Sequence, residues 1–146
     1  MDYMKSGKDC IGVGCGAIII NDRNEVLLIK RSKNSRVNPD VWSRPGGEVE
    51  FGESSAEAVE REVFEEVGIR IKAVRPLGFK DNIYPDKKTH WISIGYLAEY
   101  VSGQIENKEP DKHDDIRWFP VDKLPENVTD YTKESVEEVL KGEVEK

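Results

Sequence analysis

The sequence predicts an α/β fold, a sandwich in which a mixed β-sheet lies between helices. Two kinds of apolar pattern support this prediction. Residues 55–67 and 132–141 carry apolar side chains at helical spacing. Other segments show the short apolar runs or the alternation typical of strands. The order along the chain is strands, a helix, more strands and a second helix, and a sheet with helices on its faces fits that order.

The chain opens with two predicted strands. Residues 11–20 have the pattern of a buried strand that contains three glycines, and residues 25–31 have the pattern of a second strand. The polar residues 21–24 between them form a turn cluster, so we expect the two strands to pair as a hairpin. Residues 32–40 are polar and are predicted to form a loop.

The first predicted helix, at residues 55–67, has both a start and a stop signal. Ser54 and Glu57 are spaced as in a capping box, in which each side chain bonds the backbone near the other. Gly68 stands where a left-handed C-cap is expected. The apolar stripe that should face the core consists of Ala56, Val59, Val63 and Val67.

The second half of the chain is predicted to hold three strands and a helix. Residues 69–79 are strand-like, although Pro76 interrupts them, and residues 81–88 are predicted to form a polar loop. The remaining expected elements are a long strand at 89–101, a charged loop at 106–114, a short strand at 116–121 and a helix at 132–141 that ends at Gly142.

Size and composition limit the organisation of the chain. Its 146 residues suffice for one compact core, so we expect a flexible leader at residues 1–10 and a single domain at residues 11–146. The longest apolar stretch, residues 15–20, is far shorter than the roughly 20 residues that cross a bilayer. We expect no membrane segment, and the lack of a signal-peptide pattern and of a disulfide framework indicates a cytoplasmic protein.

The formal net charge of −7 bears on the partners of the protein. A negative chain does not attract a polyanion such as DNA over long range, so we expect no nucleic-acid partner. A negative protein that handles phosphates needs a metal ion or local basic residues to offset the repulsion.

One face of the first predicted helix carries a cluster of carboxylates. Glu62, Glu65 and Glu66 are three and four residues apart and therefore share a face. Carboxylates at this spacing repel one another, and a divalent cation such as Mg²⁺, which prefers oxygen ligands, would remove that repulsion. Acidic helix faces are usually only solvated. Two neighbours favour a site: the glycine turn at residues 45–47, and Arg61, which can bridge to nearby glutamates.

The segment around this helix resembles the Nudix box, which reads G-x5-E-x7-R-E-U-x-E-E-x-G-U with U aliphatic. A chance match at one start point is on the order of one in 10⁸ at average residue usage. The resemblance extends over roughly residues 11–124 and implies the Nudix fold, an α/β/α sandwich. All nine specified positions match, and they are Gly47, Glu53, Arg61, Glu62, Val63, Glu65, Glu66, Gly68 and Ile69.

The resemblance implies an enzyme that cuts a diphosphate bond with Mg²⁺ as its cofactor, for which Mn²⁺ can substitute. By this resemblance, Glu62 and Glu66 are the principal metal ligands and Glu65 is a third. Glu66 is the first choice for the group that accepts a proton from the attacking water, and Glu65 is the second. A carbonyl of Gly46 or Gly47 is a further expected ligand.

The resemblance also assigns structural roles and a late carboxylate. Glu53 and Arg61 are expected to form an ion pair that sets the helix geometry, and Gly47 and Gly68 complete the structural positions of the box. Relatives often draw one more metal ligand from a late loop, and here we favour Glu109 or Asp111. The acidic residues of that loop are Glu109, Asp111, Asp114 and Asp115.

The sequence indicates the residues that contact the substrate less clearly than it indicates the metal ligands. Arg44 adjoins the glycine turn and is the first choice for a phosphate contact, ahead of Arg31 and Lys30. Neither histidine of the chain, His90 or His113, has a partner pattern that indicates catalysis. A base can stack on an aromatic or planar side chain. The candidates, on segments that line the pocket in many relatives, are Phe79, Tyr84, His90 and Trp91, and we favour Phe79 and Trp91 for this contact.

Three functions remain open at this point. The first is a MutT-like pyrophosphohydrolase of nucleoside triphosphates, including modified nucleotides, with a small-molecule substrate and with a homodimer as one option. The second is a pyrophosphatase of ADP-ribose or a nucleotide sugar, which Pro85 supports weakly by its spacing from the box. The third is a binding module that has lost catalysis, although such modules usually lack one or more glutamates of the box.

Overall fold

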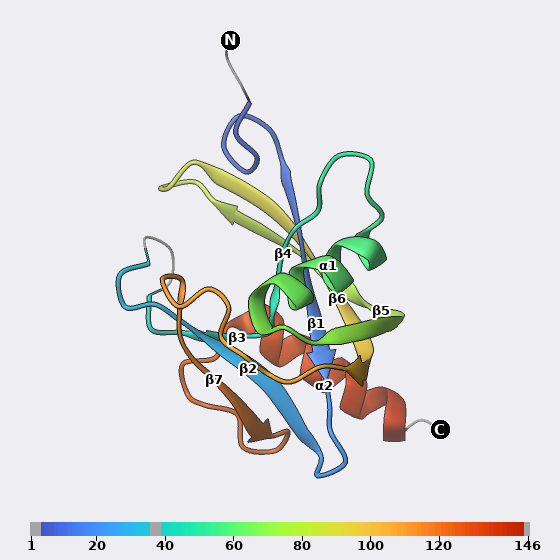
Figure 1. The fold of residues 1–146 in the computed structure, drawn as a ribbon. Helices are drawn as coiled ribbons and strands as arrows, with labels where there is room; N and C mark the ends of the chain where they lie inside the picture. Colours follow the sequence, from blue (N-terminus) through green and yellow to red (C-terminus); the bar gives the residue numbers. More distant parts are fainter. Residues whose placement is uncertain (1–3, 36–38, 145–146) are drawn as a thin grey trace.

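A computed structural model describes residues 4–35 and 39–144 of the chain, with side chains as far as residue 142 (Figure 1). Parts of the predicted leader and of the loop at 32–40 lie outside these residues. The described strands are β1 (Gly12–Ile19), β2 (Glu25–Arg31), β3 (Trp42–Ser43), β4 (Gly46–Glu48), β5 (Arg70–Tyr84), β6 (Thr89–Ser102) and β7 (His113–Pro120). The described helices are α1 (Ser55–Val67) and α2 (Asp130–Val144).

The strands form two sheets. The larger sheet has the order β4-β1-β6-β5 and is mixed, because β1 runs parallel to β6 but antiparallel to β4. The smaller sheet has the order β3-β2-β7 and is antiparallel throughout. The predicted α/β sandwich with a mixed sheet is confirmed.

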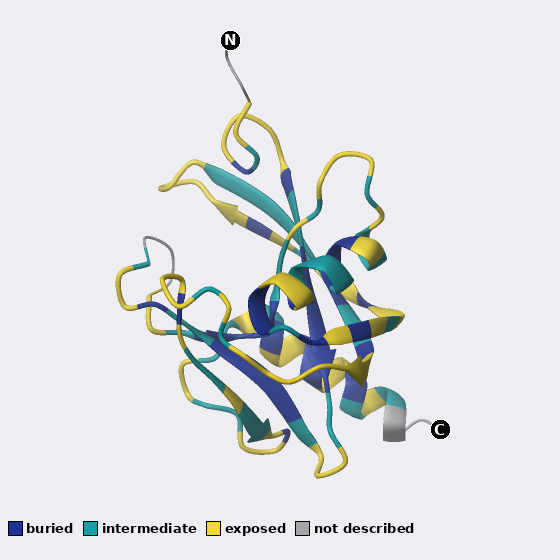
Figure 2. Cartoon of the chain, viewed as in Figure 1, coloured by how far each residue is buried: buried dark blue, intermediate teal, exposed yellow. Residues whose placement is uncertain are grey.

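The two helices cover opposite sides of the central strands. On β1, Ile19 packs in the cluster that contains α1, whereas its neighbour Ile18 packs in the cluster that contains α2. β2 alternates in the same way, with Leu27 toward α1 and Leu28 toward α2. Successive side chains of a strand point to opposite faces, so both strands are buried on both faces (Figure 2).

Helix α1 has the predicted bounds and the predicted caps. The Ser54 side chain accepts a hydrogen bond from the Glu57 backbone at 3.1 Å, and the Glu57 side chain completes the capping box. Gly68 has a φ of 75°, the left-handed conformation expected of the C-cap. The core face of α1 is made by Ala58, Val59, Val63 and Val67, together with the polar Glu66.

The predicted hairpin between the first two strands is wrong. The turn at residues 21–24 forms, and an isolated bridge joins Ile20 to Val26. Beyond it the strands separate, because β4 and β6 occupy the two edges of β1. β2 therefore pairs with β3 and β7 in the other sheet.

Three other predicted boundaries also differ from the structure. β5 continues to Tyr84 through what was expected to be a loop, and register shifts on both sides of Pro76 keep it in the sheet. β7 begins at His113 and not at residue 116. α2 runs to Val144 and includes Gly142, which was expected to end it. Within the described ranges, neither helix is long and apolar enough to cross a bilayer.

The glycines of β1 leave room for large side chains on one face of the strand. A Cβ at Gly12 would lie 2.5 Å from the Trp91 ring, and one at Gly16 would lie 2.1 Å from Nε of Arg44. A Cβ at Gly14 would make only ordinary contacts, the nearest at 3.6 Å. Trp91 and Arg44 therefore lie over the two outer glycines, and no side chain crowds Gly14 between them.

Residues 4–10 contact the same end of the large sheet. The Gly7 carbonyl accepts a hydrogen bond from the His90 backbone at 2.8 Å. A Cβ at Gly7 would lie 2.1 Å from Nε1 of Trp91. Gly7 and Gly12 thus both leave room for the Trp91 ring, which is only partly buried.

Candidate active site

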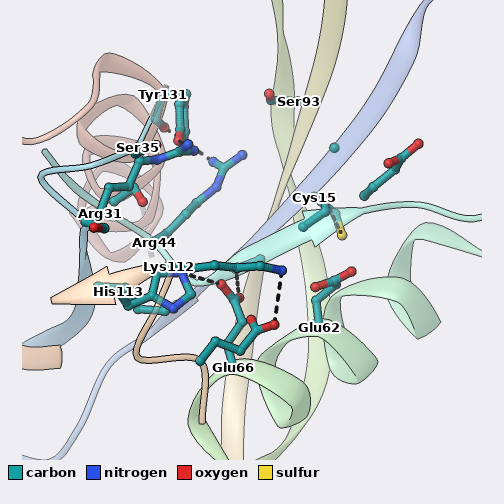
Figure 3. Close-up of a pocket in the computed structure, with 18 of the residues that line it drawn as sticks. Cys15, Arg31, Ser35, Arg44, Glu62, Glu66, Ser93, Lys112, His113 and Tyr131 are labelled. Atoms are coloured by element: carbon teal, nitrogen blue, oxygen red, sulfur yellow. Dashed lines mark hydrogen bonds and ion pairs between the residues drawn. The ribbon is translucent and has the colours of Figure 1, made fainter. Parts of the chain in front are cut away.

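A cavity of about 690 Å³ lies where α1, β4, β2 and the segment before β7 meet the start of α2. Figure 3 shows Glu62 and Glu66 projecting from α1, with His113 and Lys112 beside Glu66 and with Arg31, Arg44 and Tyr131 grouped on another side. The cavity thus has an acidic wall and a basic wall. The charged residues that line it are Arg31, Arg44, Glu48, Glu62, Glu66, Glu109, Asp111, Lys112 and His113.

Glu66 is the most buried carboxylate of the α1 cluster. Its side chain is 8% exposed, one oxygen accepts a hydrogen bond from the Gly46 backbone at 2.7 Å, and the other lies 3.2 Å from Nε2 of His113. Burial raises the pKa of Glu66, against the lowering effect of His113 and the Gly46 N–H. The carboxylate is thus oriented by two fixed partners and incompletely neutralised by them.

Glu62 lies beside Gly47 in the same wall. A Cβ at Gly47 would lie 2.3 Å from the carboxyl carbon of Glu62, so the glycine is needed for this approach. Burial raises the pKa of Glu62, and the Arg61 guanidinium, 3.0 Å away, opposes that rise. The predicted ligands Glu62, Glu66, Gly46 and Gly47 are all brought together at the cavity.

Glu65 points to a different environment. Its side chain is 51% exposed, it does not line the cavity, and its carboxylate lies 3.2 Å from Arg61. Arg61 also makes two hydrogen bonds to Glu53, at 2.7 and 2.9 Å, and one to the Glu48 carbonyl. The expected Glu53–Arg61 pair therefore forms, and it ties the loop before α1 to the helix. The structure does not place Glu65 with the other predicted ligands.

The segment before β7 supplies the late carboxylate and a residue that the sequence did not indicate. Glu109 lines the cavity and pairs with Lys112 at 3.2 Å. Asp111 lines it too, whereas neither Asp114 nor Asp115 does. His113, expected to be uninvolved, is buried against Glu66 and belongs to the site. Its only sequence signal was its place at the end of an acidic loop.

Arg44 is buried rather than on the surface. Its Nη1 donates to Oγ of Ser135 at 2.5 Å, and its guanidinium lies over the Tyr131 ring, 4.9 Å from the ring centre. Only 6% of the residue is exposed, yet it lines the cavity. Nη2 of Arg31, which also lines the cavity, lies 3.4 Å from the Tyr131 hydroxyl. α2 thus holds both arginines at the basic wall, whereas Lys30 does not line the cavity.

Of the aromatic side chains predicted to contact substrate, some line the cavity and one does not. Trp91 and Tyr84 line the cavity, whereas Phe79 is 71% exposed and does not, so the structure does not bring Phe79 to the site. Next to Trp91, the buried Asn82 donates to Oγ of Ser93 at 2.8 Å, and both of these polar residues line the cavity. The sequence did not indicate Asn82 because β5 was expected to end before residue 82, and it gave Ser93 no partner although the strand at 89–101 was predicted.

The acidic wall fits a divalent cation. One ligand atom each from Glu66, Glu109 and His113 lie within 4.8 Å of one another. The surrounding carboxylates are hard oxygen donors of the kind that Mg²⁺ and Mn²⁺ prefer. The raised pKa values of Glu62 and Glu66 reflect the cost of burying negative charge there, and a cation would reduce that cost.

These features define the class of the protein: an α/β sandwich in which an acidic helix and a glycine turn form a pocket suited to a cation and phosphates. The family model of the NUDIX domain matches residues 11–139. The chain therefore belongs to the NUDIX family, as its resemblance to the Nudix box predicted.

Solved structures agree with this assignment. The chain is similar to the MutT NUDIX hydrolase from Burkholderia pseudomallei, with 39% identity and a TM-score of 0.77, over 88% of this chain and 97% of that one. It is also similar to the MutT protein from Methanosarcina mazei Go1, with 29% identity and a TM-score of 0.77, over 92% and 96% of the two chains.

Curated relatives include NAD-capped RNA hydrolases. The chain is 38% identical to NudC of Haemophilus influenzae (strain PittEE) over 115 residues, which cover 77% of this chain and 42% of that protein. It is 39% identical to NudC of Pseudomonas aeruginosa (strain LESB58) over 108 residues, 74% of this chain and 36% of that protein. The chain thus spans about two fifths of the length of these relatives.

Proposed function

We propose that this chain is a pyrophosphohydrolase that uses Mg²⁺, or Mn²⁺ in its place, to cut a diphosphate bond of a nucleoside triphosphate or a related nucleoside diphosphate derivative. The observation that carries this proposal is the two-walled cavity. Glu62, Glu66 and Glu109 form one wall, and Arg31 and Arg44 form the other. A diphosphate with its cation needs both kinds of wall, because carboxylates bind the cation and guanidinium groups bind phosphate oxygens.

Each group has a distinct task in this proposal. Glu62, Glu66 and Glu109 would hold the cation, which would supply positive charge against the phosphate oxygens and lower the pKa of a bound water. Arg31 and Arg44 orient the phosphates through their fixed donors. Glu66 accepts a proton from the attacking water, because burial raises the pKa of its carboxylate and so makes it a stronger proton acceptor than an exposed carboxylate. Trp91 and Tyr84 provide rings on which a base can stack.

A dinucleotide is the second candidate substrate. The relatives named NAD-capped RNA hydrolases are 38–39% identical to this chain. NAD holds its pyrophosphate between two nucleosides, so its enzyme needs a ring-binding surface on each side of the cation. The cavity has Trp91 and Tyr84 from the large sheet and Tyr131 from α2, which would serve the two bases. ADP-ribose fits the same arrangement with one base fewer.

The experiment compares substrates and traces the attacked bond. Nucleoside triphosphates, ADP-ribose, a nucleotide sugar, NAD and an NAD-capped RNA oligonucleotide are incubated in H₂¹⁸O with Mg²⁺, with Mn²⁺ or with EDTA, and products are resolved by mass spectrometry. We expect metal-dependent release of a nucleoside monophosphate that carries one ¹⁸O, or of pyrophosphate that carries it. Turnover only of dinucleotides would select the second candidate. No turnover with any substrate would favour a binding module without catalysis.

The remaining predictions concern the molecule as a whole. We propose a small nucleotide, and not a nucleic-acid polymer, as the partner, since the net charge of −7 opposes a polyanion. A single domain with a flexible leader, a cytoplasmic location and a homodimer stay predictions. Light scattering on the purified chain, limited proteolysis and cell fractionation test them.

A further inference from the structure

His113 lies where β7 begins, opposite Arg31 of β2 in the sheet register. Its side chain is 10% exposed, and its Nε2 lies 3.2 Å from an Oε atom of Glu66. A ligand atom of Glu109 completes a group of three within 4.8 Å. The strand fixes the backbone of His113, so the ring is held at the acidic wall of the cavity.

Nδ1 of His113 is buried and has no hydrogen-bond partner among the described residues. In a neutral imidazole, one nitrogen carries a proton and the other carries a lone pair. If Nε2 carries the proton, it donates to Glu66 and the lone pair of Nδ1 is left without a donor. If Nδ1 carries it, the lone pair of Nε2 faces a carboxylate oxygen. In the second tautomer, a cation held between Nε2 and the carboxylates would satisfy that lone pair and remove its repulsion from the carboxylate oxygen.

We propose that His113 is a nitrogen ligand of the metal site, alongside Glu66 and Glu109, and that the site therefore favours Mn²⁺ and other first-row divalent ions over Mg²⁺. This inference rests on the proposed function, because it concerns the cation of the same site. Imidazole suits transition metals, whereas Mg²⁺ prefers an all-oxygen shell. Mn²⁺ accepts both kinds of donor, so a mixed nitrogen and carboxylate set discriminates in its favour.

The competing role for His113 is that of a hydrogen-bond donor which only orients Glu66. That role predicts no bond between the imidazole and the metal. It also predicts that loss of His113 weakens Mn²⁺ and Mg²⁺ to the same degree, because Glu66 serves both ions. A direct nitrogen ligand predicts a spectroscopic signature and unequal losses.

Pulsed electron paramagnetic resonance of the Mn²⁺-loaded full chain tests the metal–nitrogen bond directly. The chain has two histidines, so labelling with ¹⁵N-histidine and the control variant His90→Asn identify the source of any imidazole coupling. We expect imidazole modulation in the wild type and in His90→Asn, altered by the label and absent in His113→Asn. Absence of the coupling from the wild type, or its loss in His90→Asn, would overturn the proposal, and neither result depends on the folding of His113→Asn.

Calorimetric titration with Mn²⁺ and with Mg²⁺ alone provides a second readout. We expect His113→Asn to weaken Mn²⁺ by at least about tenfold, the lower end for losing even an outer-shell partner, and Mg²⁺ by clearly less. Equal losses would assign His113 to the orienting role and overturn the proposal. If the wild type binds Mn²⁺ and turns over substrate without imidazole coupling, only this inference fails. If it binds no metal, the proposed function fails with it.

Discussion

Glu65 and Glu66 are neighbours on α1, yet they lie in opposite environments. Successive residues of a helix are about 100° apart around its axis, which is enough to turn one carboxylate to solvent and the other into the cavity. The Glu65 side chain is 51% exposed and pairs with Arg61, whereas the Glu66 side chain is 8% exposed and contacts Gly46 and His113. Two glutamates of one motif thus have different chemistry available to them.

The difference shows how the surroundings divide the work of an acidic helix. On the solvent side, Arg61 neutralises Glu53 and Glu65, so that side fixes the loop to the helix. On the cavity side, Glu66 keeps a raised pKa and lies next to the late carboxylate Glu109. We therefore propose that Glu66 serves metal binding and proton transfer. Glu65 belongs to the ion-pair network of Arg61 with Glu53, Glu62 and Glu65, which we call the Arg61 network.

The largest expected effect is a difference in kcat between variants of Glu66 and Glu65. Glu66→Gln should lower kcat by at least about 10²-fold, the low end for loss of a general base. Glu65→Gln should lower it by roughly threefold or less, since exposed ion pairs contribute little. Steady-state kinetics with Mg²⁺ measure both, and circular dichroism confirms that each variant is folded. Similar losses for the two variants would contradict the division.

Alanine at Gly46 should mainly lower stability, whereas alanine at Gly47 should mainly lower turnover. A Cβ at Gly46 would lie 1.9 Å from the Cys15 carbonyl oxygen, and backbone cannot move aside easily. Gly46→Ala should therefore lower the free energy of unfolding by about 1–3 kcal/mol, the usual range for overpacking. The three atoms nearest to a Cβ at Gly47 all belong to the carboxylate of Glu62, the end of a side chain and not backbone. Gly47→Ala should stay more stable but lose turnover, by about 10²-fold for a 1 Å displacement.

Urea unfolding and steady-state kinetics on both alanine variants provide the comparison. Gly14→Ala is the matched control for stability, because a Cβ there makes only ordinary contacts. A Gly47→Ala variant that is less stable than Gly46→Ala would show that Glu62 is more rigid than the structure indicates.

The Arg61 network should show itself in the pH dependence of stability. Arg61 lowers the pKa of Glu53 to about 2, through hydrogen bonds to its carboxylate. The ordinary pKa of Glu is about 4.3, so the stability that ionised Glu53 contributes is present above that pH and is lost as pH falls toward 2. The difference in unfolding free energy between the wild type and Glu53→Gln should be level above about pH 5 and shrink below it. A difference that stays constant down to pH 2 would contradict this coupling.

The prediction furthest from catalysis concerns the two cysteines, one of which is buried and the other exposed. Burial raises the pKa of Cys15 to about 11, whereas Cys10 is exposed. Since the thiolate is the reactive form, iodoacetamide at pH 8 should modify Cys10 first and Cys15 at least about 10²-fold more slowly. Mass spectrometry of timed, quenched samples measures the two rates. Comparable rates would show that the wall beside Gly47 opens readily.

The sequence predicted what local signals specify. The capping pair at Ser54 and Glu57 and the glycine at residue 68 bound α1, and both caps form. The glutamates on that helix and the glycine turn were predicted together because the motif is contiguous. The hairpin failed because strand pairing depends on β4 and β6, which come later in the chain.

What the sequence did not predict, the place of His113 in the site and the burial of Arg44, depends on distant parts of the chain. His113 reaches Glu66 only because β7 pairs with β2, and no pattern near residue 113 reports that pairing. Arg44 is buried because Gly16 and Gly95 are partners on adjacent strands and leave a trough for its side chain. Glycines within two predicted strands were visible in the sequence, but their register was not.

Anomalous diffraction from crystals of the full chain soaked in Mn²⁺ tests the central claim most directly. We predict an anomalous peak inside the cavity, in contact with the Glu66 carboxylate and close to Glu109. A peak at the exposed face of α1, against Glu65 and away from Glu66, would contradict the claim that burial assigns the metal to Glu66.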